Sequence, residues 1–364
     1  VSQGRAWILG STMFSAGTLV ANLTLAVVLM VGAHLGVRGV LTAGTVVAFL
    51  FLVQLFTGPV QLAAEILNDL HNAVAGWGRV IAIVDTPADV VDARDARQSP
   101  RGPAQVSFQG VHFAYPGGAD VLHGIDIDLP AQARVAVVGH TGSGKTTLAK
   151  LATRLMDPTR GAVLLDGVDL RELAVDSLRR RVVLVPQEGF LFDGTIADNV
   201  AYALRTPETP DRSEGLRGHD PHSRETRARL LDVFTTLGLA DWLADLPAGL
   251  DTPVGQRGES LSAGERQLVA IVRAALAEPD LLVLDEATSA VDPATEVRIA
   301  RALERLTAHR STLTIAHRLS TAEASDLVLV VDQGNLVEVG THTDLVAAGG
   351  IYATMHAAWV AQTT

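Results

Sequence analysis

The sequence predicts a multidomain chain in which an α-helical transmembrane segment of two spanning helices is followed by an α/β domain with a parallel sheet. Three observations predict this fold class. Residues 6–37 and 39–64 form two long runs without Asp, Glu, Lys or Arg. A strand, a glycine-rich loop and a helix follow one another from Arg134 onwards. Further along, an apolar run ends in the carboxylates Asp285 and Glu286. The first pattern is typical of helices that span a bilayer, and the other two are typical of an α/β domain.

The two apolar runs are long enough to cross a membrane. Each exceeds the ~20 residues that span ~30 Å of hydrocarbon, and only a short loop around Arg38 separates them. A secretory signal would instead show one short apolar core and a cleavage site. Arg5 and Arg79 flank the outer ends, which favours a hairpin with both ends in the cytoplasm. A pair of buried core helices in a large soluble domain is the alternative.

The second apolar run continues beyond the length of a bilayer. Apolar residues recur at helical spacing from Ile66 to Val84, which predicts one helix from about Gly44 to Val84. At 1.5 Å per residue this helix is roughly 60 Å long, about twice the hydrocarbon thickness. We therefore expect half of it to project into the cytoplasm and to pack on neighbouring helices.

The composition excludes several classes of function. The 364 residues carry a formal net charge of −11, whereas a nucleic-acid-binding protein needs a basic surface. We therefore expect no nucleic-acid partner. The chain contains no cysteine, so disulfides, thiolate metal sites and cysteine nucleophiles are excluded together.

Proline and glycine mark the boundaries between the parts. Helical periodicity ends at Thr86-Pro87, and residues 99–103 read Ser-Pro-Arg-Gly-Pro, which is the composition of a linker. The expected parts are a partial transmembrane domain at residues 1–85, a linker at 86–103 and a second domain at 104–364.

The glycine-rich loop in the second domain has the pattern that binds nucleotide phosphates. Residues 139–146 read Gly-His-Thr-Gly-Ser-Gly-Lys-Thr, between an apolar strand and a helical pattern. The glycines let successive backbone N–H groups face the phosphates, Lys145 reaches the β- and γ-phosphates, and the Thr146 hydroxyl ligates Mg²⁺. A chance glycine-rich turn is the alternative. Because a strand and a helix flank the loop, the second domain is predicted to be an α/β P-loop NTPase domain that binds nucleotide.

The apolar run at 281–284 ends in Asp285 and Glu286. Such a run is typical of a strand buried on both faces of a parallel sheet, and ligands of such sheets bind beyond the carboxyl ends of the strands. We expect Asp285 to hold Mg²⁺, directly or through water, and Glu286 to polarise the water that attacks the γ-phosphate. Two solvated acids at a strand end are the alternative.

A third motif, at residues 261–267, reads Leu-Ser-Ala-Gly-Glu-Arg-Gln and precedes a long helical pattern. Ser262 and Glu265 form a capping box, and a helix start with a serine hydroxyl and free N–H groups is also an anion site. Gly264 allows close approach. Between a P-loop and the run Leu-Asp-Glu-Ala-Thr-Ser-Ala-Val-Asp at 284–292, this motif resembles the signature of ATP-binding cassette (ABC) transporters. The resemblance covers residues 104–360.

The resemblance implies roles for further motifs. Tyr115 resembles the aromatic residue that stacks on adenine, Gln187 the Q-loop, residues 289–292 the D-loop and His317 the H-loop. The implied cofactors are ATP and Mg²⁺. The expected catalytic residues are Lys145, Gln187, Glu286 and His317, and the expected metal ligands are Thr146, Gln187 and Asp285. The expected nucleotide-binding residues are Tyr115, Gly139, Thr141, Gly142, Ser143, Gly144, Lys145, Thr146, Thr147, Ser262, Gly264 and Asp292.

An ABC exporter subunit that hydrolyses ATP is the function that the resemblance implies. Its place would be the inner or plasma membrane, with the nucleotide-binding domain in the cytoplasm. In the family two such domains pair head to tail, with ATP between the P-loop of one and the signature of the other. The expected partners are therefore a second half-transporter, identical or different, and membrane lipid.

The resemblance also implies how much of an exporter half the chain contains. Family members carry six spanning helices per half, whereas this sequence shows two, so we expect an N-terminally truncated half-transporter. The transported substrate is unidentified, with an amphiphile as the candidate class.

Two other functions compete with this reading. A fragment of an ABC ATPase without transport activity of its own is an alternative that the sequence leaves open. An ATP-driven clamp of the chromosome-maintenance type also carries a P-loop and a signature. It needs long heptad coiled coils between them, and none occurs between Thr147 and Leu261.

Overall fold

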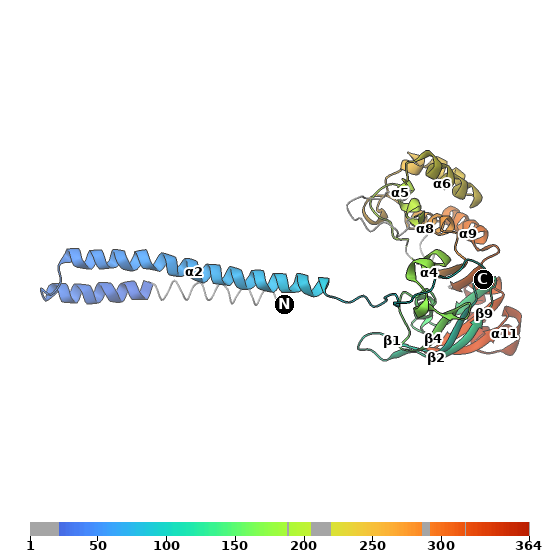
Figure 1. The fold of residues 1–364 in the computed structure, drawn as a ribbon, viewed down its shortest axis with the longest axis horizontal. Coiled ribbons are helices and arrows are strands. Elements are labelled where there is room, and N and C mark those ends of the chain that lie inside the picture. Colours follow the sequence, from blue (N-terminus) through green and yellow to red (C-terminus); the bar gives the residue numbers. More distant parts are fainter. Residues whose placement is uncertain (1–21, 188, 205–219, 286–291, 317, 364) are drawn as a thin grey trace. The chain divides into compact units, whose positions relative to one another are not determined.

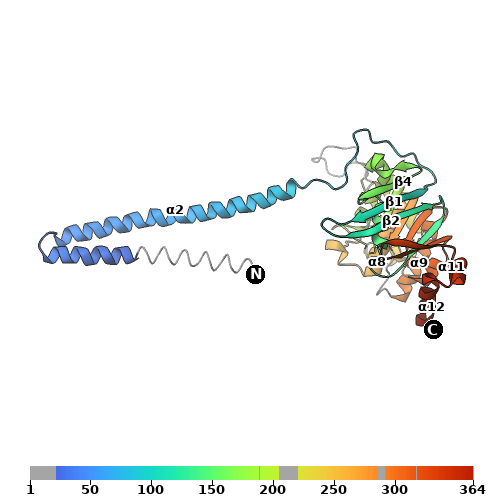
Figure 2. The same ribbon diagram turned by 90° about the horizontal axis from the view of Figure 1, so that it is seen from below.

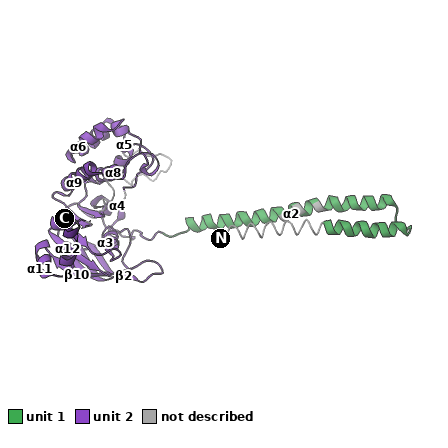
Figure 3. Ribbon diagram, turned by 180° about the vertical axis from the view of Figure 1, so that it is seen from behind, with its two compact units in different colours: residues 1–87 green, residues 88–364 purple. Residues whose placement is uncertain are grey.

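The computed structural model describes residues 22–363 apart from 188, 205–219, 286–291 and 317. The chain divides into two compact units, Val1–Pro87 and Ala88–Thr364, which are coloured separately in Figure 3. The division falls inside the predicted linker 86–103, most of which belongs to the second unit.

The described residues of the first unit form two antiparallel helices joined by a short turn (Figure 1). A helix at Asn22–Val37 precedes α2 (Ala43–Val84), which is 42 residues long. Thr42 caps α2, because its side-chain oxygen accepts a hydrogen bond from the N–H of Thr45 at 3.2 Å. Gly32 lets the two helices approach closely, since a Cβ at this position would lie 2.8 Å from a methyl group of Val46.

Helix α2 matches the predicted long helix from about Gly44 to Val84. Among the residues that the structure describes, it is the one helix long and apolar enough to cross a membrane, while the helix at Asn22–Val37 is apolar but shorter. Residues 6–21 of the first predicted span lie outside the described part. Large apolar side chains of α2 such as Phe51 and Phe56 are mostly exposed.

The second unit is built on two β-sheets (Figure 1). A four-stranded antiparallel sheet has the order β2-β1-β4-β5, and a six-stranded sheet has the order β10-β9-β3-β8-β7-β6. In the larger sheet β9, β3, β8, β7 and β6 are parallel, and β10 is antiparallel to β9. The strands are β1 (Val106–Ala114), β2 (Asp120–Leu129), β3 (Arg134–Val138), β4 (Arg160–Leu165), β5 (Val168–Asp169), β6 (Val182–Val185), β7 (Leu281–Asp285), β8 (Ser311–Ile315), β9 (Leu327–Asp332) and β10 (Asn335–Gly340).

One face of the six-stranded sheet packs against α3 (Lys145–Ala152) and the smaller sheet. Leu148 and Leu151 of α3 share a hydrophobic core with Val137 of β3 and with Leu281 and Val283 of β7. The same core contains apolar residues of β1, β2 and β4 and of α4 (Val175–Arg181). Helix α3 therefore lies between the two sheets.

The opposite face packs against a different set of helices. Leu282 and Leu284 of β7 join a second core with α8 (Ala263–Leu276) and α9 (Pro293–Thr307). Because successive side chains of a strand point to opposite faces, α3 and α8 lie on opposite faces of the sheet. The remaining helices of the described residues are α5 (Ile196–Ala201), α6 (Arg224–Thr236), α7 (Ala240–Asp245), α10 (Leu319–Glu323), α11 (His342–Ala348), α12 (Ile351–Thr363) and the short 3₁₀ turns η1 (Leu170–Glu172), η2 (Tyr202–Leu204), η3 (Gly249–Asp251) and η4 (Gln256–Gly258). Helices α11 and α12 are labelled in Figure 2.

Two buried arginines fasten the segment 88–103 to the rest of the second unit. Arg154 donates a hydrogen bond to the carbonyl oxygen of Val91 at 2.9 Å. Arg181 donates to the hydroxyl of Ser99 at 2.7 Å and to the carbonyl oxygen of Gly102 at 3.0 Å. Each arginine is only 1% exposed. This part of the predicted linker is therefore packed against the domain that follows it.

Candidate nucleotide-binding site

The motifs predicted from the sequence follow the carboxyl ends of four neighbouring parallel strands. Gly139 comes directly after β3, Gln187 follows β6, and Asp285 is the last residue of β7. Since these strands and β8 are parallel and adjacent, their carboxyl ends form one edge of the sheet, where ligands of such sheets bind. Glu286 and His317, which follow β7 and β8 in the chain, lie outside the described residues.

Two glycines allow the loop at 139–146 to take its shape. Gly139 has φ +151°, and a Cβ there would lie 2.0 Å from the carbonyl oxygen of Val331. Gly144 has φ +106° at the N-cap of α3, and a Cβ would lie 2.7 Å from Leu122. A side chain at Gly139 would therefore displace the backbone of β9, and one at Gly144 would displace the buried side chain of Leu122 in β2.

Lys145 lies at the first position of α3 and is 7% exposed. Its Nζ donates hydrogen bonds to the carbonyl oxygens of Gly139 and His140, each at 2.8 Å. Burial lowers the pKa of Lys145, and the nearby carboxylate of Asp285 acts in the opposite direction. The ammonium group is thus held inside its own loop by carbonyl dipoles, where the phosphates of a nucleotide would offer stronger acceptors.

The loop contains a buried polar atom whose hydrogen-bonding capacity is unused. The Oγ atom of Ser143 is buried and has no hydrogen-bond partner among the residues that the structure describes. Thr141 and Gly142, the preceding residues, are exposed. Buried hydroxyls are nearly always paired, so the orphaned Ser143 hydroxyl beside an open loop fits a site whose missing partner is a ligand oxygen.

Tyr115 is fixed beside the first turn of α3. Its hydroxyl lies 3.2 Å from Oγ1 of Thr147, and its ring makes an edge-to-face contact with Phe113 at 5.0 Å between centroids. The residue is nevertheless 40% exposed. A fixed, partly open aromatic ring next to a phosphate-binding loop is suited to stacking on a base.

The residues predicted to hold Mg²⁺ supply only oxygen ligands. Thr146 is an exposed residue of the first turn of α3, Gln187 is exposed beyond β6, and Asp285 is partly exposed at the end of β7. A hydroxyl, an amide oxygen and a carboxylate are the hard ligands that Mg²⁺ prefers. The donor set therefore fits this ion.

The signature residues begin helix α8. Ser262 is its N-cap and accepts a hydrogen bond from the N–H of Glu265 at 3.2 Å, while Glu265 accepts one from the N–H of Ser262 at 2.8 Å. This is the predicted capping box. Ser262 is exposed and Gly264 is buried. Because α8 packs on the face of the sheet opposite to α3, the structure does not join these residues to the P-loop helix of the same chain.

Asp292 stabilises the start of helix α9. It is the N-cap of α9, and its carboxylate accepts a hydrogen bond from the N–H of Thr295 at 3.0 Å. This hydrogen bond lowers the pKa of Asp292. Asp292 is exposed, so its carboxylate remains accessible from solvent. The preceding residues 289–291 of the predicted D-loop lie outside the described residues.

Sequence reasoning missed a residue that supports the P-loop from behind. Gly334, in the turn between β9 and β10, donates its N–H to the carbonyl oxygen of Ser143 at 3.0 Å and accepts a hydrogen bond from the N–H of His123 at 2.9 Å. Its φ of +77° requires glycine, because a Cβ would lie 2.3 Å from the carbonyl oxygen of Val121. The Gln-Gly turn was visible in the sequence, but its contact with the P-loop was not.

Comparison with known proteins identifies the family. Residues 122–289 match the sequence profile described as ABC transporter. An uncharacterized ABC transporter ATP-binding protein of Bacillus subtilis is 35% identical over 90% of this chain and 51% of its own length. An ATM1-type heavy metal exporter of Novosphingobium aromaticivorans is 37% identical over 95% of this chain and 54% of its own. A lipid A-core flippase of Pectobacterium atrosepticum is 40% identical over 93% and 55%. The chain thus spans about half the length of these relatives.

A solved structure is similar over almost the whole chain. A bacterial Atm1-family ABC exporter with ATP bound is 34% identical, with a TM-score of 0.68, and the match covers 97% of this chain and 58% of that one. The family profile covers the P-loop, Gln187, the signature and Asp285. Of these, the P-loop, Gln187 and Asp285 follow or end strands at the edge of the sheet described above. The chain therefore belongs to the ABC transporter family and carries the family's ATP-binding domain.

Proposed function

We propose that this chain is the ATP-hydrolysing, membrane-anchored part of an ABC exporter half that drives efflux of an unidentified substrate. The observation that carries the proposal is the convergence of the P-loop, Gln187 and Asp285 at one edge of the parallel sheet. An Atm1-family ABC exporter matches this chain over 97% of its length, which supports the proposed function in export.

The groups at the sheet edge have distinct tasks in this proposal. The backbone N–H groups of residues 139–146 and the Nζ atom of Lys145 bind the β- and γ-phosphates. Thr146, Gln187 and Asp285 would hold Mg²⁺, which offsets the charge on the phosphates. The exposed ring of Tyr115 stacks on the adenine.

Hydrolysis also needs a base. Glu286 follows the last residue of β7, and we assign it the role of accepting a proton from the attacking water. Gln187 and His317 complete the proposed catalytic set. The roles of Glu286 and His317 rest on their places in the chain, directly after β7 and two residues after β8.

The proposed partner is a second half-transporter. Since α8 lies on the face of the sheet opposite to the P-loop helix α3 of its own chain, Ser262 and Gly264 are assigned to the nucleotide that another chain holds. Their helix begins with an exposed serine, and its N-terminal dipole attracts phosphate. The complete ATP site therefore contains the P-loop of one half and the signature of the other.

The helical hairpin of the first unit is the proposed membrane anchor, with both ends in the cytoplasm and the surrounding lipid as its partner. The second unit then lies in the cytoplasm at the inner or plasma membrane. Washing membranes with alkaline carbonate tests this placement. The chain is expected to stay in the membrane pellet, and its recovery in the supernatant would refute the anchor.

A mixing experiment with the purified full chain in detergent tests the composite site. Ser262→Arg puts bulk and positive charge at the signature and should abolish ATPase turnover while the chain still binds a fluorescent ATP analogue. Lys145→Ala should abolish nucleotide binding. When the two variants are dissociated, mixed and reassembled, half of the dimers contain one chain of each kind. Each of these dimers has one intact site out of two, so about one quarter of wild-type turnover should return in a two-fold dimer.

Ser223→Arg is the matched control, because Ser223 caps α6 through the same type of hydrogen bond, to the N–H of Thr226. Loss of such a cap costs about 1 kcal/mol, and turnover should remain near the wild-type value. If the mixture of Ser262→Arg and Lys145→Ala regains no turnover while both variants keep their fold, the composite site is wrong. If Ser223→Arg lost as much turnover as Ser262→Arg, the role of Ser262 would be that of a helix cap only.

A further inference from the structure

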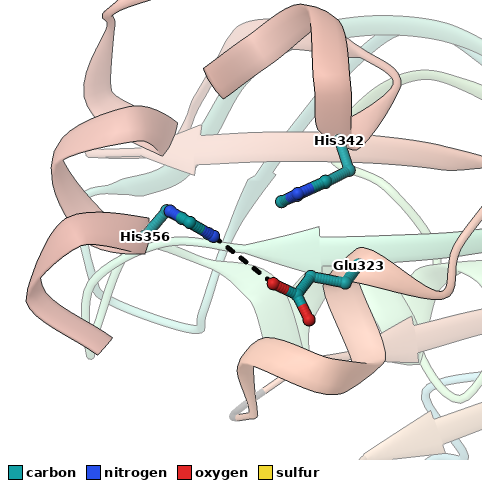
Figure 4. Close-up of side chains that lie close together, drawn as sticks. All are labelled: Glu323, His342 and His356. Carbon is teal, nitrogen blue, oxygen red and sulfur yellow. Dashed lines mark hydrogen bonds and ion pairs between the residues drawn. The ribbon is translucent and has the colours of Figure 1, made fainter. Parts of the chain in front are cut away.

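Two histidines and a carboxylate from the last part of the sequence come together in the second unit. Glu323 ends α10, His342 begins α11, and His356 lies in the second turn of α12 (Figure 4). One potential ligand atom of each residue lies within 4.8 Å of the other two. Three helices that are separate in the sequence therefore present one nitrogen or oxygen ligand each to a common point.

Two of these atoms, from His356 and Glu323, have the spacing of metal ligands. The Nε2 atom of His356 lies 3.4 Å from Oε1 of Glu323. Two ligands of one tetrahedral zinc ion, each about 2.0–2.1 Å from the metal, are separated by about 3.3–3.4 Å. The pair thus has the separation of bound ligands, and the ring of His342 lies 5.1 Å from that of His356 between centroids.

Tyr352 orients the third ligand. The Nδ1 atom of His342 lies 2.8 Å from the hydroxyl of Tyr352, which leaves Nε2 of His342 for a metal. A ligating histidine commonly donates its other ring N–H to a fixed oxygen in this way. Tyr352 is fully buried, so its hydroxyl is fixed in place beside His342.

The backbone around the cluster is also fixed. The carboxylate of Glu338 in β10 accepts hydrogen bonds from the N–H groups of Ile351 and Tyr352 at 2.6 and 3.0 Å. These bonds hold the first turn of α12, and His356 follows one turn after Tyr352. An ion can still enter from solvent, because the side chains of His356 and Glu323 are 21% and 42% exposed.

We propose that His342, His356 and Glu323 form a binding site for a divalent transition-metal ion of the Zn²⁺ class, with water as the fourth ligand. Two imidazoles and a carboxylate suit Zn²⁺ and Co²⁺ rather than Mg²⁺ or Ca²⁺. The bound ion joins α10, α11 and α12, and so stabilises the C-terminal part of the ATP-binding domain. An ordinary ion pair between a protonated His356 and Glu323, without metal, is the competing explanation.

Titration of the purified, tag-free full chain with Co²⁺ in detergent tests the site. Nucleotide and Mg²⁺ are left out, and the protein is first treated with a chelator. We expect one equivalent of Co²⁺ to give the strong visible absorption of a tetrahedral complex and Zn²⁺ to displace it. His342→Ala and His356→Ala should each weaken binding at least about 100-fold, and Tyr352→Phe, which keeps all three ligands, by about 10-fold.

His309→Asn is the matched control, because His309 is an exposed histidine outside the cluster whose positive φ suits asparagine. It should bind Co²⁺ as the wild type does. Glu323→Gln removes an exposed charge at a helix end and should keep the fold while weakening binding. Saturating Zn²⁺ should raise the melting temperature of the wild type and of His309→Asn but not of His356→Ala. The proposal fails if no tetrahedral complex forms, or if the cluster variants bind Co²⁺ as tightly as His309→Asn does.

Discussion

Replacing Arg181 by methionine tests whether one buried arginine joins the segment 88–103 to the ATP-binding domain. The guanidinium of Arg181 lies 2.7 Å from carboxylate oxygens of both Asp280 and Asp166. It also donates to the hydroxyl of Ser99 and the carbonyl oxygen of Gly102. Methionine keeps an unbranched apolar stem of similar length but removes the charge and every one of these hydrogen bonds.

The expected cost follows from the burial of the two carboxylates. Removing one partner of a buried ion pair costs about 3–5 kcal/mol. The side chain of Asp280 is 14% exposed, so it would be left with little water, whereas Asp166 is 37% exposed and is rehydrated at small cost. Asp280 keeps the N–H of Gly102 at 3.2 Å and Arg101 at 3.7 Å. We therefore expect a loss near the lower end, about 3 kcal/mol.

Thermal unfolding of the purified full chain, followed by near-ultraviolet circular dichroism, measures this loss. In domains of roughly 150–250 residues, 1 kcal/mol corresponds to a shift of about 2–4 °C in Tm, so Arg181→Met should unfold at least about 6 °C below the wild type. Arg180→Met is the control on the same helix α4, because Arg180 is exposed. Its Tm should change by about 1–2 °C at most. Equal Tm values for the two variants would refute the reasoning.

Three further predictions concern the ATP-binding domain. Gly139→Ala should abolish binding of a fluorescent ATP analogue, because the new Cβ would lie 2.0 Å from a backbone oxygen. The Cβ of Gly142→Ala has no atom within 4 Å, so this variant should lose only about 1–2 kcal/mol of stability in thermal unfolding, from backbone strain. Tyr115→Ala should weaken ATP binding about 10-fold or more through lost stacking, and Tyr115→Phe should not. A hydrogen bond from Arg134 lowers the pKa of Asp326 in the folded chain. The ionised Asp326 therefore contributes its full stabilisation above the unfolded pKa of about 3.9. This stabilisation is lost as the pH falls through the lower pKa of the folded state. Asp326→Asn should therefore flatten the fall in unfolding free energy below about pH 4 in urea titrations.

The sequence alone predicted the local chemistry of the proposed nucleotide site. The function of its parts depends on backbone shape and on neighbours within a few residues. These parts are the loop at 139–146, the strand end at Asp285 and the capping box at Ser262. The long helix α2 was also predictable, because an uninterrupted apolar pattern of 3.6-residue period has few other solutions. For such segments the physical cause lies in the segment itself.

Tertiary structure decided the features that join distant parts of the chain. The opposite placement of α3 and α8 depends on which face of β7 each helix covers, and no spacing in the sequence records that choice. Gly334 supports the P-loop, and Arg181 binds the segment 88–103, through contacts between residues far apart in the chain. Glu323, His342 and His356 lie on three different helices, so no spacing in the sequence indicated that they come together. Side-chain contacts across packed elements depend on the whole fold, and only the folded chain shows them.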